Sequence, residues 1–160
     1  AGVVARPPAS PYDTLVVAGG TRSGVASGME AFGAGNVPLG VVSSVSADFS
    51  RITLFSAPGA VTHGWVGSAH TPLIIFGEGA GAMRATLPRS APVAVGDAVF
   101  VPGPGLLPVG RVVRIDSDPA EPGVVLRIAS NANLFSAGWV ELRDIGAALR
   151  DSFSLSTTTP

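Results

Sequence analysis

The sequence has no cysteine and no lysine, and few of its residues are charged. The lack of cysteine excludes disulfides and thiolate metal sites, although it leaves the cellular compartment open. Charged residues make up 13% of the chain, every basic residue is an arginine, and the formal net charge is −1. A chain with so little charge lacks the basic surface that nucleic acid or an anionic membrane attracts, so we predict neither partner.

Long apolar runs are missing as well, because no stretch approaches the roughly 18 residues of a membrane-spanning helix. Hydrophobic residues still make up 46% of the 160 residues, which is enough for the core of one domain or of two small ones. The chain starts at Ala1 with an apparent strand and without a methionine or a signal-like region. We therefore expect a longer polypeptide to precede Ala1.

Glycine and proline are abundant, and they separate short apolar runs. The runs that predict strands are residues 2–5, 12–18, 29–32, 39–45, 51–55, 61–66, 72–76, 82–87, 98–101, 109–115, 124–128 and 139–142. Only residues 144–150 have helical spacing, and residues 152–160 predict a disordered polar tail. Many short strands without a helix of normal length indicate an all-β fold, and closed small barrels would remove the exposed edges of such strands.

One ordered pattern occurs twice, about 70 residues apart. In each copy a V-x-x-G turn is followed by an apolar strand, a glycine-rich loop, the string P-[LV]-G-x-V-x-x-[VI] and a further apolar strand. The pattern predicts two related small β units rather than a solenoid, with Gly40 and Gly110 at matching positions. Structural turn roles are predicted for Gly28, Gly40, Gly96, Asp97 and Gly110, and Gly96 is expected to have a positive φ.

Catalytic and cofactor patterns are weak. No serine lies in a glycine-flanked nucleophile loop that could pair with His63 and Asp97, and the spacing of His63 and His70 fits no metal motif. Residues 77–82 fit G-x-G-x-x-[GA], but Pro88 leaves no room for the helix that a dinucleotide needs. We predict no catalytic, cofactor or metal residues. The aromatic residues, Trp65 and Trp139 among them, are predicted to be mostly core.

An ordered series of short strings runs through the chain: Arg6-Pro7-Pro8, Tyr12-Asp13-Thr14-Leu15-Val16-Val17, Gly20, Gly24-Val25, Gly28-Met29, Gly40-Val41-Val42, Arg51-Ile52-Thr53-Leu54 followed by Pro58, the expected turn at residues 77–81, Leu87-Pro88, Val95-Gly96-Asp97-Ala98-Val99, Pro108-Val109-Gly110-Arg111-Val112 and residues 124–128. In this order the strings resemble the extracytoplasmic region of the rod shape-determining protein MreC family, over most of residues 2–142. The loop at residues 103–107 is shorter than is common in that family, and it lacks the aromatic residue often found there.

This resemblance implies two small six-stranded-type β-barrels packed side by side, in a chymotrypsin-like arrangement without catalytic residues. We expect the first barrel in residues 1–58, with a strand near 137–143 as a candidate to complete it. The second barrel is expected in residues 59–136, and a short helix and disordered tail in residues 144–160. The family also implies a membrane helix and a coiled coil ahead of Ala1.

The implied function is a non-enzymatic scaffold of the bacterial cell-shape machinery, on the extracytoplasmic face of the cytoplasmic membrane. Its implied partners are cell-wall synthesis proteins, such as a penicillin-binding protein and other membrane proteins of the rod complex, and further copies of itself. Apolar pairs in turn-rich places, Leu106-Leu107 and Leu134-Phe135, are the candidate protein interface. The alternatives are a serine-hydrolase-like double barrel with an unrecognised site, or a small-ligand or carbohydrate-binding β module.

Overall fold

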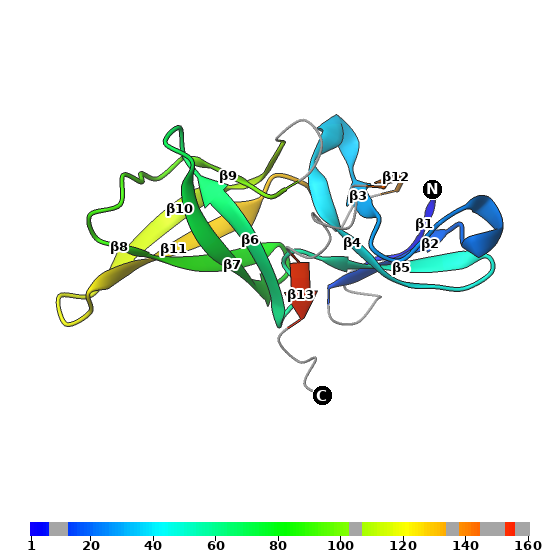
Figure 1. The fold of residues 1–160 in the computed structure, drawn as a ribbon, viewed down its shortest axis with the longest axis horizontal. Helices are drawn as coiled ribbons and strands as arrows, with labels where there is room; N and C mark the ends of the chain where they lie inside the picture. Colours follow the sequence, from blue (N-terminus) through cyan, green and yellow to red (C-terminus); the bar gives the residue numbers. More distant parts are fainter. Residues whose placement is uncertain (7–12, 103–106, 134–137, 145–152, 156–160) are drawn as a thin grey trace.

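The computed structural model describes residues 1–6, 13–102, 107–133, 138–144 and 153–155, which form two curled β-sheets lying side by side (Figure 1). Strands and short 3-10 turns are the only regular elements among these residues, which confirms the all-β prediction. None of the described residues forms a helix long and apolar enough to cross a membrane.

The first sheet has six strands in the order β1-β2-β5-β4-β3-β12. Their bounds are β1 Val3–Ala5, β2 Thr14–Ala18, β3 Glu30–Phe32, β4 Pro38–Val45, β5 Phe49–Leu54 and β12 Glu141–Arg143. The two edges of the sheet approach each other, because Gly2 and Trp139 form an isolated antiparallel bridge. Leu15, Ile52 and Leu54 fill the inside of this curled half-barrel together with Val140 from the far end of the chain.

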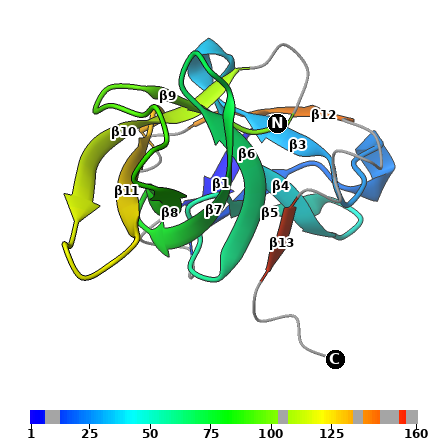
Figure 2. The ribbon, with the colours of Figure 1, turned by 60° about the vertical axis from the view of Figure 1, so that its left-hand side comes forward.

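The second sheet has seven strands, of which six form a closed barrel and the seventh, β13 Phe153–Leu155, pairs with the first strand of that barrel. The barrel contains β6 Ala60–Val66, β7 Thr71–Gly79, β8 Ala82–Pro88, β9 Ala98–Phe100, β10 Pro108–Ser117 and β11 Gly123–Ser130. Closure occurs because β6 pairs with β7 on one side and, through Trp65 and Val66, with β9 on the other (Figure 2). A larger apolar cluster, which includes Ile75, Met83 and Leu126, fills this barrel.

The internal repeat is confirmed by identical strand register in the two sheets. Phe32 and Ala31 of β3 pair with Pro38 and Gly40, just as Phe100 and Val99 of β9 pair with Pro108 and Gly110. Each sheet also carries a β-bulge at the same place, between Val42 and Ser44 in β4 and between Val112 and Arg114 in β10. The match therefore extends from the sequence pattern to the irregularities of the pairing.

The predicted turn role is wrong for Gly40 and Gly110, which lie inside β4 and β10. A Cβ on Gly40 would be 2.2 Å from the carbonyl oxygen of Thr53, and a Cβ on Gly110 would be 2.3 Å from that of Ala129. Both distances are shorter than real Cβ contacts, so the neighbouring strand leaves no room for a side chain. The two glycines permit a close backbone approach rather than a change of direction.

Gly28, Gly96 and Asp97 do lie in turns, as predicted. The φ angle is +92° at Gly28 and +96° at Gly96, in the region that glycine adopts without a steric penalty. Asp97 stabilises its turn directly, because its Oδ2 accepts a hydrogen bond from the backbone N–H of Ala94 at 2.9 Å. In both copies the turn glycine donates to the bulged strand, Gly28 to Val42 O and Gly96 to Val112 O, each at 2.8 Å.

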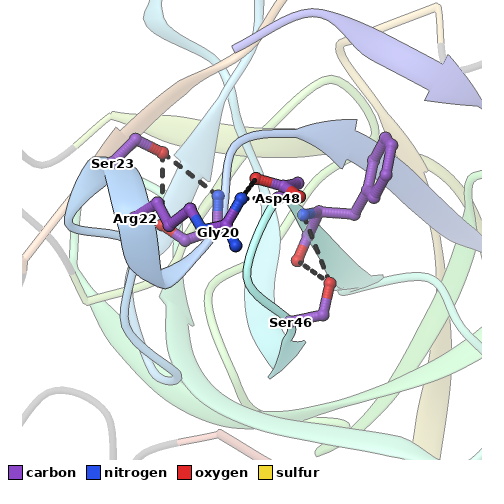
Figure 3. A network of polar contacts seen from close by, with 6 residues as sticks. Gly20, Arg22, Ser23, Ser46 and Asp48 are labelled. Atoms are coloured by element: carbon purple, nitrogen blue, oxygen red, sulfur yellow. Dashed lines mark hydrogen bonds and ion pairs between the residues drawn. The ribbon is translucent and has the colours of Figure 1, made fainter.

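A polar network holds the 3-10 turn Thr21–Ser23 against the β4–β5 hairpin (Figure 3). Ser23 Oγ accepts from Gly20 N–H and donates to Gly20 O, both at 3.1 Å. Arg22 Nη1 lies 3.2 Å from Asp48 Oδ1, across the hairpin. Both charged side chains are exposed, and exposed pairs of this kind contribute at most about 1 kcal/mol, so the network fixes the local path more than it stabilises the fold.

Three further predictions are corrected. Residues 77–79, which lie between the strands predicted at 72–76 and 82–87, continue β7, so the hairpin turn expected there is confined to Ala80-Gly81. Residues 153–155, expected in a disordered tail, form the strand β13 Phe153–Leu155, which pairs with the Ala60–Thr62 end of β6. Trp139 is 70% exposed and is not a core residue. The helix predicted at 144–150 lies outside the described residues, except for Asp144, which is in no regular element.

The two sheets contact each other through buried side chains and backbone. Val41 of β4 belongs to the apolar core of the second barrel, although β4 is a strand of the first sheet. Ser56, between the sheets in sequence, donates to Asp13 Oδ2 at 2.7 Å, and its carbonyl oxygen accepts from Gly79 N–H at 2.6 Å. These contacts make a shared interior between the two sheets rather than a flexible link.

Candidate protein-docking surface

Only one residue of the predicted interface pairs, Leu107, lies within the described part of the chain. Leu106, Leu134 and Phe135 lie outside the described residues, and Leu107 is half-buried. The backbone N–H of Asn131 donates to Val109 O at 3.1 Å, which places the chain after Leu107 next to the chain before Leu134. An interface role for these four leucine and phenylalanine residues stays a prediction.

A hollow of about 620 Å³ lies beside these segments. Its lining contains both apolar and polar residues: Phe32, Gly33, Ala34, Leu39, Asn131, Ala132, Asn133, Gly138, Trp139 and Glu141. The lining residues come from two parts of the chain, residues 32–39 in the first sheet and residues 131–141, which follow β11. The hollow therefore exists only because residues 138–143 return to the first sheet.

Trp139 separates this hollow from a second one of about 430 Å³, which it also lines. The tryptophan is held on the outside of the sheet by backbone bonds on either side of it, from Val3 N–H to Gly138 O at 3.1 Å and from Val140 N–H to Ala1 O at 2.9 Å. A large aromatic side chain that is 70% exposed between two hollows is typical of an anchor in a protein–protein interface.

Arg143 fixes the strand that carries this surface. Its guanidinium lies 4.2 Å from the centre of the Phe32 ring and donates to both carboxylate oxygens of Glu141, at 3.0 and 2.9 Å, and to Asn36 Oδ1 at 3.0 Å. The hydrogen bonds from Arg143 lower the pKa of Glu141 below its ordinary value. Glu141 is therefore ionised well below neutral pH and gives the rim of the larger hollow a negative charge.

Glu30 is a buried carboxyl group under the same strand. Its side chain is 0% exposed, and neither carboxyl oxygen has a hydrogen-bond partner among the described residues. Burial raises its pKa to about 8, and the charge of Arg143, its register partner in β12, opposes that shift. Val41, opposite Glu30 in β4, packs into the second barrel, so the carboxyl lies on the face turned to that barrel. Sequence reasoning missed Glu30, because a lone glutamate beside an apolar strand resembles a surface residue.

The residues of the rejected catalytic and cofactor patterns lie apart from this surface. Asp97 bonds to its own turn, His63 is exposed on β6, and His70 packs edge-on against Trp65 and Phe100. The glycines of residues 77–81 lie at the end of β7 and in the turn that connects it to β8, so a strand and not a helix follows them. Among the described residues no group of three or more His, Cys, Asp or Glu could hold a metal ion.

The fold and this surface define an all-β protein made of a closed barrel and a curled half-barrel sheet, with a candidate docking surface. The family model of the rod shape-determining protein MreC, barrel core, matches residues 3–142. The chain therefore belongs to the MreC family, as the motif order indicated. A search of curated proteins gives no match.

Solved structures of the family share the fold. MreC from Pseudomonas aeruginosa is 20% identical, with a TM-score of 0.79 over 89% of this chain and 96% of that one. MreC from Listeria monocytogenes is 19% identical, with a TM-score of 0.73 over 99% and 77%. The structure of a complex between penicillin-binding protein PBP2 and MreC from Helicobacter pylori contains a chain that is 14% identical, with a TM-score of 0.57 over 95% and 91%.

Proposed function

We propose that this chain is a non-enzymatic scaffold domain of the cell-shape machinery, located outside the cytoplasmic membrane, that binds a penicillin-binding protein and further copies of itself. The family membership supports the scaffold role, and a related structure described as the major periplasmic domain of MreC supports the location. The Helicobacter pylori complex supports a penicillin-binding protein as partner. We further propose that the two sheets are the two domains of this scaffold, divided near residues 58 and 59.

The observation that carries the docking surface is the exposure of Trp139 between two hollows. An aromatic residue in that position buries a large area when a partner covers it, and truncation of such anchors commonly costs 2 kcal/mol or more of binding free energy. The surface has few charges, so binding would depend on shape and apolar contact rather than on electrostatic steering. We therefore expect the affinity for the penicillin-binding protein to change little with salt.

Binding to the extracytoplasmic region of the cognate penicillin-binding protein tests the proposal. Trp139→Ala should weaken binding at least about tenfold, corresponding to about 1.4 kcal/mol or more, without lowering the melting temperature. Phe49→Ala is the matched control, because Phe49 is also an exposed aromatic residue, 49% accessible, at the far hairpin of the first sheet. Equal effects of the two variants would contradict the assignment of the surface, and no binding by the wild type would contradict the proposed partner.

The lining of the larger hollow also supports a second candidate, a carbohydrate-binding role. Trp139 offers an exposed aromatic face, and Asn131 offers an amide, which are groups that commonly hold a sugar ring. Titration with a soluble glycan fragment of the cell wall, followed by the tryptophan fluorescence of wild type and Trp139→Ala, distinguishes this role from protein docking.

A further inference from the structure

The edge of β6 that closes the barrel is covered only in part by the barrel itself. At one end of that edge, Trp65 and Val66 pair with β9. A Cβ on Gly64 would lie 2.2 Å from Phe100 O, so β9 also lies close there. At the other end, Ala60–Thr62, the partner among the described strands is β13 (Figure 1). The six strands of the barrel therefore close without β13, which is added to their edge.

The stretch of β6 at residues 60–62 has the properties of a site that accepts an added strand. Backbone N–H and C=O groups at a strand edge pair with any extended chain that fits beside them. Ala60 and Thr62 are buried, at 0% and 1% exposed, whereas Val61 between them is half-buried on the opposite face. A strand added here therefore has two positions beside the barrel interior and one position between them on the outer face.

The sequence of β13 follows this alternation, but its attachment is weak. The register places Phe153 opposite Thr62 and Leu155 opposite Ala60, with a serine between them. Among the described strands, β13 pairs with β6 alone, and it does so through three residues. A terminal strand with so few backbone bonds belongs to the least stable part of a fold, which opens without global unfolding. The edge of β6 is therefore held by an occupant that can leave it.

The hydroxyl group of Thr62 shows that β13 is not the best-fitting occupant. Thr62 Oγ1 is buried and has no hydrogen-bond partner among the described residues, which costs free energy. The residue directly opposite in an added strand lies on the same face, with its Cβ about 5 Å from that of Thr62. In β13 this residue is Phe153, and phenylalanine has no hydrogen-bonding group in its side chain. A serine, threonine or asparagine at that position would have one.

We propose that residues 60–62 of β6 form a strand-accepting site for an extended segment of a partner protein, and that β13 is the chain's own occupant, which this segment replaces. The partner segment pairs antiparallel with β6, with a hydroxyl or amide side chain opposite Thr62 and an apolar side chain opposite Ala60. A charged side chain at either position would lose its hydration without a counter-ion. The site lies on the second barrel and is separate from the Trp139 surface, so the inference goes beyond the proposed function.

The test is NMR titration of the ¹⁵N-labelled full chain with two synthetic peptides, with the amides of Ala60–Thr62 as reporters. Both peptides have the sequence of residues 151–160, with threonine or valine in place of Phe153. The two side chains have similar shapes and differ in the hydroxyl group, so the threonine peptide should bind at least about threefold more tightly. In the Thr62→Val variant this preference should reverse, because the peptide hydroxyl would then be the group without a partner.

Competition by β13 is tested in the full chain with the double substitution Phe153→Ser and Leu155→Ser. This variant should bind the threonine peptide at least about tenfold more tightly than the wild type, because a tethered strand competes at an effective concentration of roughly 1 mM. Ser154→Thr is the matched control, since it changes the same strand at the position opposite half-buried Val61, and it should bind like the wild type. Circular dichroism checks that the barrel of each variant is folded.

Four outcomes would overturn the inference. Equal affinities of the two peptides would show that Thr62 selects no partner group, and equal affinities of wild type and double variant would show that β13 does not hold the site. No binding to the double variant up to about 1 mM, or shifts that map outside β6 and its neighbours, would exclude strand addition there. A wild-type dimer in sedimentation that the double variant loses would assign the edge to the tail of a second copy. The penicillin-binding protein assay with Trp139→Ala is independent of all four.

Discussion

Gly40 and Gly110 occupy the same position in the two sheets, each with a neighbouring carbonyl oxygen where its Cβ would be. Gly40 pairs with Leu54, and Gly110 pairs with Ser130, and in each strand a bulge begins two residues later, after Val42 and after Val112. The absence of a side chain lets the strand approach Thr53 in one sheet and Ala129 in the other. Glycine is thus required twice by the same geometry, which explains why the pattern P-x-G-x-V recurs in the sequence.

The first prediction is that Gly110→Ala destabilises the protein by about 2–4 kcal/mol, because the added methyl group forces the bulged strand away from β11. Gly40→Ala should have a similar effect in the first sheet. Gly138→Ala is the control, since nothing lies within 4 Å of a Cβ at that position, and it should cost little. Urea unfolding of the three variants measures the differences. A Gly110→Ala variant as stable as Gly138→Ala would show that the strands can separate without cost.

The second prediction concerns the turn before β9. Gly96 has a φ of +96° and open space around its Cβ position, so a substitution there meets backbone strain and no clash. Gly96→Val should cost well over about 1 kcal/mol, because a β-branched residue is strained at positive φ. Asp97→Asn should cost less than about 0.5 kcal/mol, because the amide oxygen can still accept from Ala94 N–H. Thermal unfolding measures the difference. Equal melting temperatures for wild type and Gly96→Val would show that the turn does not require the positive φ of glycine.

The third prediction follows from the buried carboxyl of Glu30, whose pKa burial raises from its ordinary value of 4.5 to about 8. Between these two values the folded protein holds a proton that the unfolded chain releases. The free energy of unfolding is therefore greatest below pH 4.5 as far as this group is concerned, and it falls as the pH rises to about 8, by up to about 1.4 kcal/mol per pH unit. Urea unfolding between pH 5 and pH 9 should show this decline in wild type and lose it in Glu30→Gln.

A fourth prediction uses Arg143, whose charge lowers the pKa of Glu30. Arg143→Gln should extend the same stability decline to higher pH, because the pKa of folded Glu30 rises once the opposing charge is gone, while the pKa of the unfolded chain is unchanged. It should also raise the pKa of Glu141, which loses the hydrogen bonds that lower it. A pH profile identical to that of the wild type would show that Arg143 and Glu30 do not interact across β3 and β12.

The sequence predicted the parts of this fold that depend on local pattern. Alternating apolar strands, the positive φ of Gly96 and the matching copies around Gly40 and Gly110 were all visible, because they rest on turn chemistry and on periodicity over a few residues. The ends of strands were predicted less accurately. For example, β7 continues for three residues beyond its predicted end at Phe76. Glycine there serves a close approach, since a Cβ on Gly77 would lie 2.0 Å from Ala57 O.

The candidate site was largely beyond such reasoning. Whether Trp139 points inward or outward depends on its bridge with Gly2, 137 residues away in the chain, and nothing in the neighbourhood of Trp139 records that contact. Glu30 is buried for two reasons. β12 lies beside it on one side, and Val41, its partner in β4, packs into the core of the second barrel on the same face of the sheet. β13 has only three residues, too few for a period to be visible.

The closing strands differ in how far apart their partners lie along the chain. The second barrel is closed by β6, which pairs with β7 directly after it and with β9, so all of its strands come from residues 60–130. The first sheet needs β12, which pairs with β3 about a hundred residues earlier. Contacts between residues far apart in the chain form slowly, and the ribosome synthesises a chain from its N-terminus. The first sheet, although most of it is synthesised first, should therefore complete its folding after the second barrel. Until residues 138–143 have been synthesised, the edge of β3 has no partner strand. The first sheet is therefore still incomplete when all six strands of the barrel are already available to pair.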